Sequence, residues 1–256
     1  YLKSNPNATR DDIVEFLDQF TKKVIQPIID KSSAEISEWF NAYENSLNMD
    51  REIIADIMIS TGKKRYSARI WDDEGNRLSQ PKKKIVGLDI KRSDTPADVR
   101  IQLTKILDLI FENDNEALVK MISDYENKMK TLPIDLVAIP SGINDITKYE
   151  GALKSVPMHV KASLIFNKII KERNMKNYVP INNGDKIKFI FLKKNPITQS
   201  EVIAYNDVEF LHDLGLDKFI DYQRLFDRTF LSPVKSLTDA INWNTNANSL
   251  LLDDLF

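Results

Sequence analysis

The spacing of apolar residues changes near Asn48, and this change limits the folds that the chain can adopt. Before it, apolar side chains recur every three or four residues, as they do on a helix that buries one face. These residues are Ile13, Phe16, Leu17, Phe20 and Val24. After it, short runs with β-like alternation follow one another. The first part of the chain is therefore predicted to be a long helix followed by a small antiparallel sheet.

Local signals indicate where these elements begin and turn. Thr9 is a favourable N-cap, and Asp12 stands at the capping-box position three residues later. Pro27 is expected to kink or briefly interrupt the helix, because proline lacks an amide hydrogen. Further along, the segment from Asp72 to Asn76, which contains Gly75, is predicted to be a hairpin turn.

A second, mainly helical region is expected after a boundary near residues 89–94. Thr95 as N-cap and Pro96 at the first helical position predict its first helix. Other apolar patterns predict the remaining elements. They are helices over residues 115–130, 159–172, 216–230 and 234–243, the last two separated by Pro233, strands over 136–139 and 187–191, and a loop over 140–145.

Composition excludes several classes of site and partner. The 256 residues contain no cysteine, so disulfides, thiolate catalysis and cysteine-based zinc sites are ruled out. No apolar run reaches the roughly 18 to 20 residues that cross a bilayer, which predicts no membrane partner. The net charge is -2, so any contact with nucleic acid has to be made by local basic patches.

The strongest local patch is the basic run from Gly62 to Tyr66, whose sequence is Gly-Lys-Lys-Arg-Tyr. It leads into an alternating segment, so it places cations and an aromatic ring on a strand, which suits the binding of a polyanion. The alternative is an edge strand that carries solvated lysines. Upstream, Asp50 and Glu52 flank Arg51, and here the alternative to a functional role is a structural ion pair with that arginine.

These two motifs, in this order, resemble the palm subdomain of family B DNA polymerases of T-even-type tailed phages. The resemblance continues in register through residues 141–149 to the final peptide. It implies an α+β fold, with a partial palm of one long helix and a small antiparallel sheet over residues 1–88. A mainly helical thumb with a few short strands would follow over 89–241, and a flexible tail over 242–256.

The resemblance also implies a DNA-directed DNA polymerase, which transfers nucleotides from dNTPs to a primer 3′-OH using Mg²⁺. Lys64 would reach a minor-groove acceptor near the primer terminus, where the acceptors are almost independent of sequence. Lys63 and Arg65 would face backbone phosphates or support the strand, and Tyr66 would pack on the terminal sugar-phosphate. The carboxylates that would support the metal site from outside its ligand shell are Asp50 and Glu52.

The family's metal-binding aspartates lie in a Tyr-Gly-Asp-Thr-Asp-Ser turn that this sequence lacks. Tyr1 and Leu2 resemble the continuation of that strand, so the chain is expected to begin just past those aspartates, to hold no metal ligands and to be inactive alone. Its partners would be primer-template DNA and an upstream portion with the exonuclease, fingers and catalytic palm. The expected location is the cytoplasm of an infected bacterial host.

In the thumb, small residues, amides and lysines near a helix start would bind duplex phosphates without reading sequence. The residues so implied are Ser141, Asn144, Lys148, Tyr149, Lys154, His159 and Lys161. For His159, a role as a cap or packing residue is the alternative. The runs at residues 82–84 and 193–194 are expected to be solvated lysines, with contact to distant parts of the DNA as the alternative.

The leucine-rich C-terminal peptide resembles the sliding-clamp-binding peptide of phage replicative polymerases. A short apolar peptide on a polar tether suits groove binding, and the tether raises its effective concentration. The residues implied are Leu250, Leu251, Leu252, Leu255 and Phe256. The alternative is a tail that folds back onto its own domain. A different function also fits, namely a non-catalytic DNA-binding adaptor that recruits a ring-shaped partner through this peptide.

Overall fold

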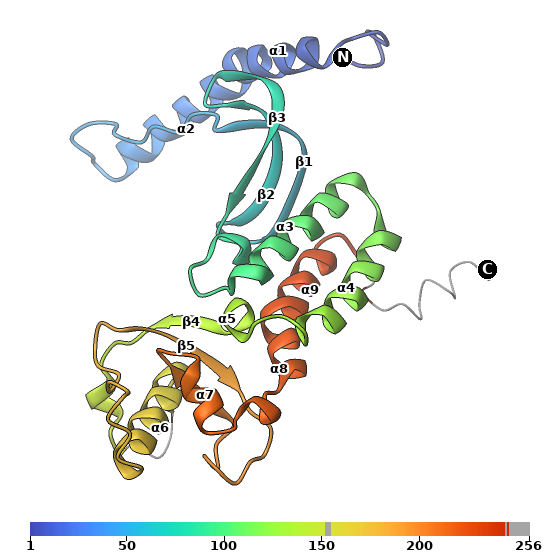
Figure 1. Ribbon diagram of the computed structural model, residues 1–256. Helices are drawn as coiled ribbons and strands as arrows, with labels where there is room; N and C mark the ends of the chain where they lie inside the picture. Colours follow the sequence, from blue (N-terminus) through green and yellow to red (C-terminus); the bar gives the residue numbers. More distant parts are fainter. Residues whose placement is uncertain (152–154, 244, 246–256) are drawn as a thin grey trace. The chain divides into compact units, whose positions relative to one another are not determined.

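The computed structural model describes residues 1–151, 155–243 and 245. Within them the protein has the predicted α+β fold, with sheets of strand order β1-β2-β3 and β4-β5-β6 (Figure 1). Contacts divide the chain into two compact units. The first unit comprises Tyr1–Ser60 and Arg65–Val86, and the second comprises Thr61–Lys64 and the described residues from Gly87 onward.

The first unit begins with one long helical segment. It consists of α1 (Arg10–Phe20), a π-helical turn η1 (Thr21–Ile25) and α2 (Gln26–Trp39). The predicted capping box is confirmed, because the Asp12 amide donates to Thr9 Oγ1 at 3.2 Å and the Thr9 amide donates to Asp12 Oδ2 at 2.8 Å. Pro27 lies in the first turn of α2, directly after the π turn. The expected irregularity is therefore a widened turn, and the helix continues through it.

Three strands follow: β1 (Ile53–Gly62), β2 (Arg65–Asp73) and β3 (Asn76–Val86). All of their residues except Thr61 and Gly62, at the end of β1, belong to the first unit. The predicted hairpin turn between β2 and β3 is confirmed at Glu74 and Gly75, which have φ values of 54° and 87°. Such positive φ values match the twist of the strands in a two-residue hairpin. A second two-residue turn, Lys63-Lys64, joins β1 to β2.

A buried charged network ties α1 to the sheet. Arg51 donates from Nη2 to Asp18 Oδ1 at 2.8 Å and from Nη1 to Asp72 Oδ1 at 2.7 Å. Apolar packing beside it is small and includes Val14, which clusters with Ile54 and Trp71. Ion pairs and a few apolar contacts thus connect α1 to the sheet. Because an ion pair needs a defined geometry, it fixes how the helix crosses the strands.

The second unit opens with the short helix η2 (Asp89–Lys91), followed by α3 (Ala97–Glu112) and α4 (Asn115–Met129). The predicted second helix, 115–130, is confirmed. Helix α3 begins one residue later than predicted, with Pro96 at the N-cap and no side-chain cap from Thr95. The predicted strand over 136–139 is largely wrong: a helical turn α5 (Ile134–Val137) occupies its first half, and only Ile139 belongs to a strand. A four-residue apolar run fits either structure, and here Pro133 precedes a helical turn.

The predicted loop over 140–145 is also partly wrong, because its first residues belong to β4 (Ile139–Gly142). This strand pairs with β5 (Lys186–Phe191), which confirms the strand predicted there, and β5 pairs with β6 (Val202–Tyr205). Helix α6 (Met158–Glu172) packs against β6 and confirms the helix predicted over 159–172. The short helices between and after these strands are η3 (Ile146–Tyr149), α7 (Glu209–Asp213) and η4 (Asp217–Phe219).

The chain's last described helical segment runs without a break through α8 (Tyr222–Phe226), a π turn η5 (Asp227–Leu231) and α9 (Ser232–Asp239). The predicted separation at Pro233 is therefore wrong. In η5 the Ser232 amide donates to the Asp227 carbonyl, and Gln26 bonds Thr21 in the same way before Pro27. A widened turn accommodates a proline that would otherwise clash with the preceding turn. No helix among the described residues is both long and apolar enough to span a bilayer.

Candidate functional site

Lys63 and Lys64 form the tip of the β1–β2 hairpin, and both side chains are exposed. Lys64 has a φ of 59°, in the left-handed region. For a residue with a side chain this conformation costs on the order of 1 kcal/mol. The turn therefore presents two adjacent cations at the end of a strand pair, which is an arrangement able to contact a polyanion.

Arg65 and Tyr66 begin β2 and are half-buried. The next residues anchor the strand: Ser67 and Ala68 are buried, and Ser67 Oγ donates to the Lys84 carbonyl at 3.0 Å. The two exposed lysines thus precede a strand whose own start is fixed by packing and hydrogen bonding. This rigidity limits the entropy lost when the tip binds a ligand.

Tyr66 is also fixed by a polar cluster at this end of the sheet. Its hydroxyl donates to Glu52 Oε1 at 3.2 Å, and Lys84 Nζ lies 2.8 Å from the same oxygen and 2.9 Å from Asp73 Oδ1. Lys84 lowers the pKa of Glu52, with a further contribution from Tyr66. Burial, together with Glu52, raises the pKa of Tyr66. Glu52 is therefore ionised and Tyr66 neutral at pH 7, with the tyrosine acting as the donor.

Two expectations about charged residues need correction. Lys84 is not a solvated lysine, since it joins two carboxylates. Arg51 forms a structural ion pair, but with the distant residues Asp18 and Asp72 and not with its sequence neighbours. The signal missed in the sequence is the alternation along β3, which puts Lys82 and Lys84 on one face and Lys83 on the other. Of the two that share a face, Lys84 is the one that reaches Glu52.

The residues present do not fit a magnesium site. Asp50 accepts a hydrogen bond from Asn48 at 2.9 Å, while Glu52 is already neutralised by Lys84. Within the described ranges, no group of three or more histidine or acidic side chains is placed to hold a metal ion. Magnesium needs oxygen ligands arranged octahedrally around one point, and Asp50 and Glu52 bind separate partners. We therefore derive no chemical step through a metal for this chain.

The second group of predicted site residues lies in the second unit, beginning at β4. Ser141 is half-buried in that strand, and Asn144 and Lys148 are exposed. The Lys148 ammonium lies 5.8 Å from the centre of the Tyr149 ring. A hydrogen bond of 2.7 Å from the Ile146 amide to Asn183 Oδ1 holds the turn that carries them. The segment thus presents an amide and a lysine on an anchored backbone.

His159 and Lys161 occupy the first turn of α6, against which η3 packs. Burial lowers the pKa of His159, so its imidazole is neutral at pH 7 and can donate a hydrogen bond without adding charge. Lys161 lies 3.7 Å from Glu201 Oε1, which partly neutralises it. Lys154 and the predicted clamp-binding residues lie outside the described residues.

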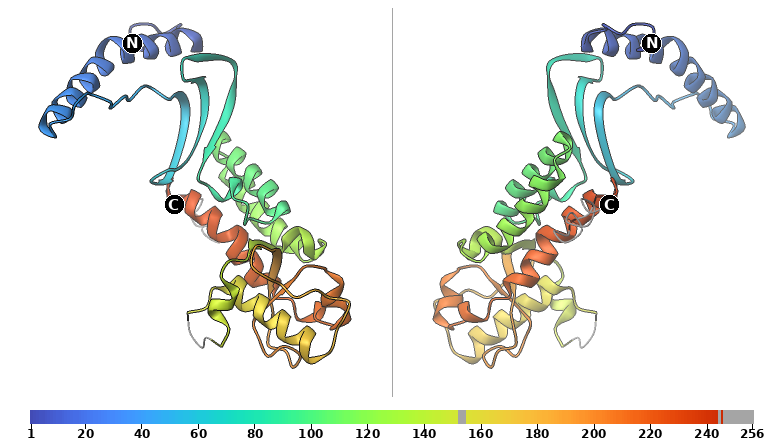
Figure 2. Two further views of the ribbon diagram at one scale, coloured as in Figure 1. Left: turned by 90° about the vertical axis from the view of Figure 1, so that its left-hand side faces the viewer. Right: turned by 90° about the vertical axis from the view of Figure 1, so that its right-hand side faces the viewer.

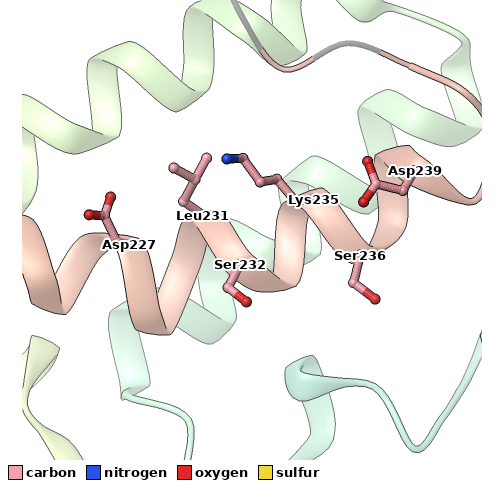
Figure 3. A pocket seen from close by; sticks show the side chains of 6 residues that line it. All are labelled: Asp227, Leu231, Ser232, Lys235, Ser236 and Asp239. Atoms are coloured by element: carbon pink, nitrogen blue, oxygen red, sulfur yellow. The ribbon is translucent and has the colours of Figure 1, made fainter.

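Figure 3 shows an open depression on the helical segment η5–α9, away from all of these residues in the sequence. One lysine lies between two carboxylates there, so the depression has no strong charge of either sign. We assign it no function. Its lining residues are Asp227, Leu231, Ser232, Lys235, Ser236 and Asp239.

Comparison with known proteins shows the family of the chain. The family model of DNA polymerase family B matches residues 10–241. The chain is 29% identical over 254 residues to a DNA-directed DNA polymerase of Escherichia phage RB69, covering 94% of the chain and 28% of that polymerase. It is 26% identical over 246 residues to a DNA-directed DNA polymerase of Enterobacteria phage T4, covering 90% of the chain and 27% of that polymerase. The chain spans little more than a quarter of the length of these relatives, and it belongs to DNA polymerase family B.

Proposed function

We propose that this chain is the part of a family B DNA polymerase that holds primer-template duplex, with Lys63 to Tyr66 at the primer terminus. The observation that carries the proposal is the exposed pair Lys63-Lys64 on a turn that leads directly into the anchored strand β2. A lysine on a fixed turn can test the geometry of a terminal base pair, because minor-groove acceptors differ little between sequences.

The polar cluster supports this assignment through Tyr66. Glu52 and Lys84 hold the ring at a fixed place beside the lysine turn. A ring fixed in this way can pack on a sugar-phosphate without a large loss of side-chain entropy. In this proposal Glu52 positions Tyr66 and does not bind a metal, while nucleotidyl transfer with Mg²⁺ depends on residues outside this chain.

We further propose that the loop of residues 141–149 and the first turn of α6 contact the phosphates of the duplex. Lys148 supplies an exposed cation and Asn144 an exposed amide, and His159 supplies a neutral N–H group. These groups can bind phosphate oxygens of any sequence. Lys161 contributes less, since Glu201 competes for its charge.

The proposed link to a sliding clamp depends on the sequence of residues 250–256 alone. Its apolar side chains follow a polar, asparagine-containing tether. A tethered peptide of this kind raises the local concentration of its partner without a large interface. The clamp would keep the duplex within reach of the basic turn between successive additions.

The test is complementation. The chain is mixed with a separately expressed polypeptide that supplies the remaining portion of the polymerase, and Mg²⁺-dependent primer extension is measured. We expect extension from the mixture and none from the chain alone. Duplex binding without extension in the mixture would favour the adaptor function instead.

The first prediction is that Lys64→Ala slows extension by the reconstituted enzyme. The loss should be roughly tenfold, which is the effect of removing one charge-assisted hydrogen bond. Lys82→Ala is the matched control, because Lys82 is an exposed lysine on β3 of the same sheet but away from the turn. Equal extension rates for wild type and Lys64→Ala would overturn the primer-terminus role.

A further inference from the structure

The long helical segment of the first unit exposes an unusual amount of apolar surface. Trp39 is 88% exposed, Phe40 77% and Ile28 62%. Phe16, Phe20 and Val24 are each more than a third exposed. Isolated exposed apolar residues are common on proteins, but a contiguous series along one element marks an interaction surface.

Four of these residues form one row. Phe16, Phe20, Val24 and Ile28 follow one another at intervals of four, through the π turn η1. Residues four apart lie on the same side of a helix. The rings of Phe16 and Phe20 confirm the contact, with centroids 6.1 Å apart. We call these four residues the apolar row.

The rest of the first unit leaves this segment largely uncovered. Of its described residues, only Val14, Asp18 and Ser33 are buried. Both views in Figure 2 show the helical segment extending past the three-stranded sheet, so that α2 has no strand beneath most of its length. Helices in water depend on tertiary packing of their apolar face. Another protein surface is therefore needed to cover α2.

We propose that the apolar row docks onto the remaining portion of a family B DNA polymerase, namely the part of the relatives that this chain does not match. The inference rests on the proposed function and names the surface through which the two portions assemble. The relatives from phages RB69 and T4 are matched over only 28% and 27% of their lengths, so most of their protein mass is available to cover this surface.

The size of the surface suits a stable interface. At about 150 to 250 Å² for a large aromatic side chain, Trp39, Phe40 and the fully exposed Tyr43 alone present on the order of 500 Å². Adding the apolar row brings the total into the range of the roughly 800 Å² that each partner buries in a standard interface. An apolar surface of this size on an unpartnered monomer would favour aggregation.

The experiment measures association directly, without DNA. The full chain and a separately expressed polypeptide for the remaining portion of the polymerase are mixed, and the dissociation constant is measured by calorimetry or sedimentation. Ile28→Asp should weaken association by about 30-fold or more, the effect of losing a central contact. Val24→Asp, in the same row, should have a similar effect.

Ile101→Asp is the matched control, because Ile101 is 55% exposed on α3 of the second unit, close to the 62% of Ile28. It should leave association unchanged. Circular dichroism of each variant checks that it is folded, which is expected because these side chains are exposed.

The possible outcomes separate this inference from the proposed function. Unchanged association in both Ile28→Asp and Val24→Asp overturns the interface, even if the mixture extends primers. A second outcome would also overturn the inference: the chain associates with itself, and Ile28→Asp abolishes this self-association without affecting binding to the polymerase portion. The apolar row would then bind a second copy of the chain. Association that Ile28→Asp weakens, without primer extension, supports the interface while the proposed function fails.

Discussion

The two units of this protein are stabilised in different ways. In the first unit, the ion pairs of Arg51 with Asp18 and Asp72 join helix to sheet, and apolar packing beside them is slight. In the second unit, packed rings dominate: Phe166 and Phe210 have centroids 4.5 Å apart, and both are fully buried.

This difference separates two physical roles. Apolar burial stabilises a fold without demanding one exact arrangement. A buried ion pair adds little net stability against an apolar replacement, but it is costly to break and it restricts geometry. In the first unit, which carries the Tyr66 cluster, the ion pairs thus fix how α1 lies on the sheet, alongside a few buried apolar contacts. The second unit is a conventional packed domain.

The largest expected effect tests the packed core. Phe210 is fully buried and also lies 5.3 Å from Tyr178, ring centre to ring centre. Phe210→Ala should lower the free energy of unfolding of the second unit by about 4 kcal/mol, because it removes buried surface and leaves a cavity. Hydrogen exchange resolved by peptide should show faster exchange there and no change in the first unit. Equal loss of protection in both units would show that they unfold as one.

A slightly smaller effect is expected in the first unit. Arg51→Met leaves the buried carboxylates Asp18 and Asp72 without the cation that they share and should cost about 3 kcal/mol, at the low end of the range for breaking a buried pair. The cost is at the low end because Lys22 lies 2.8 Å from Asp18 and Arg77 lies 3.7 Å from Asp72. Denaturation followed by hydrogen exchange measures it. A loss below about 0.5 kcal/mol would mean that apolar contacts hold this unit as well.

The smallest effect concerns pH and has a different onset in each unit. Burial lowers the folded-state pKa of His159 below 6.5, so the unfolded state binds more protons and the second unit loses stability as pH falls from about 6.5. Lys22, with a further contribution from Arg51, lowers the pKa of Asp18 from 3.8. The first unit therefore keeps the stability contributed by the ionised Asp18 until pH falls below about 3.8.

Urea denaturation at pH 7 and pH 5 measures the histidine effect. His159→Gln should remove part of the loss seen in wild type, while an unchanged pH dependence would show that His159 does not cause it. Hydrogen exchange at the same two pH values, corrected for the intrinsic exchange rate, assigns the loss to the second unit or to the first.

Local signals in the sequence predicted local structure well. Thr9 and Asp12 lie three residues apart and bond each other directly, and Gly75 satisfies the turn between β2 and β3. The predicted helix break at Pro233 was wrong because the effect of a proline depends on the preceding turn, and here a π turn over the preceding residues accommodates it. The backbone can adopt such a turn with many sequences, so nothing in the composition indicates it.

In the candidate site too, some features follow from the sequence and others depend on the folded arrangement. The sequence predicted that Lys63 and Lys64 lie on a strand, with solvated lysines as the alternative, whereas both are exposed in the turn between β1 and β2. The partners of Arg51 lie 33 and 21 residues away, so only the folded arrangement of helix and sheet brings them together. Likewise, three consecutive lysines look equivalent in the sequence until strand pairing sets which one reaches Glu52 and Asp73.

The left-handed backbone at Lys64 has a consequence for engineering this protein. Glycine adopts that φ without penalty, so Lys64→Gly would make the hairpin easier to form and would remove one of the two positive charges of the turn in the same step. Under the proposed role at the primer terminus, selection for heat tolerance alone would therefore favour variants that bind DNA less tightly. Stability of the turn and binding of DNA would then place opposite demands on a single side chain.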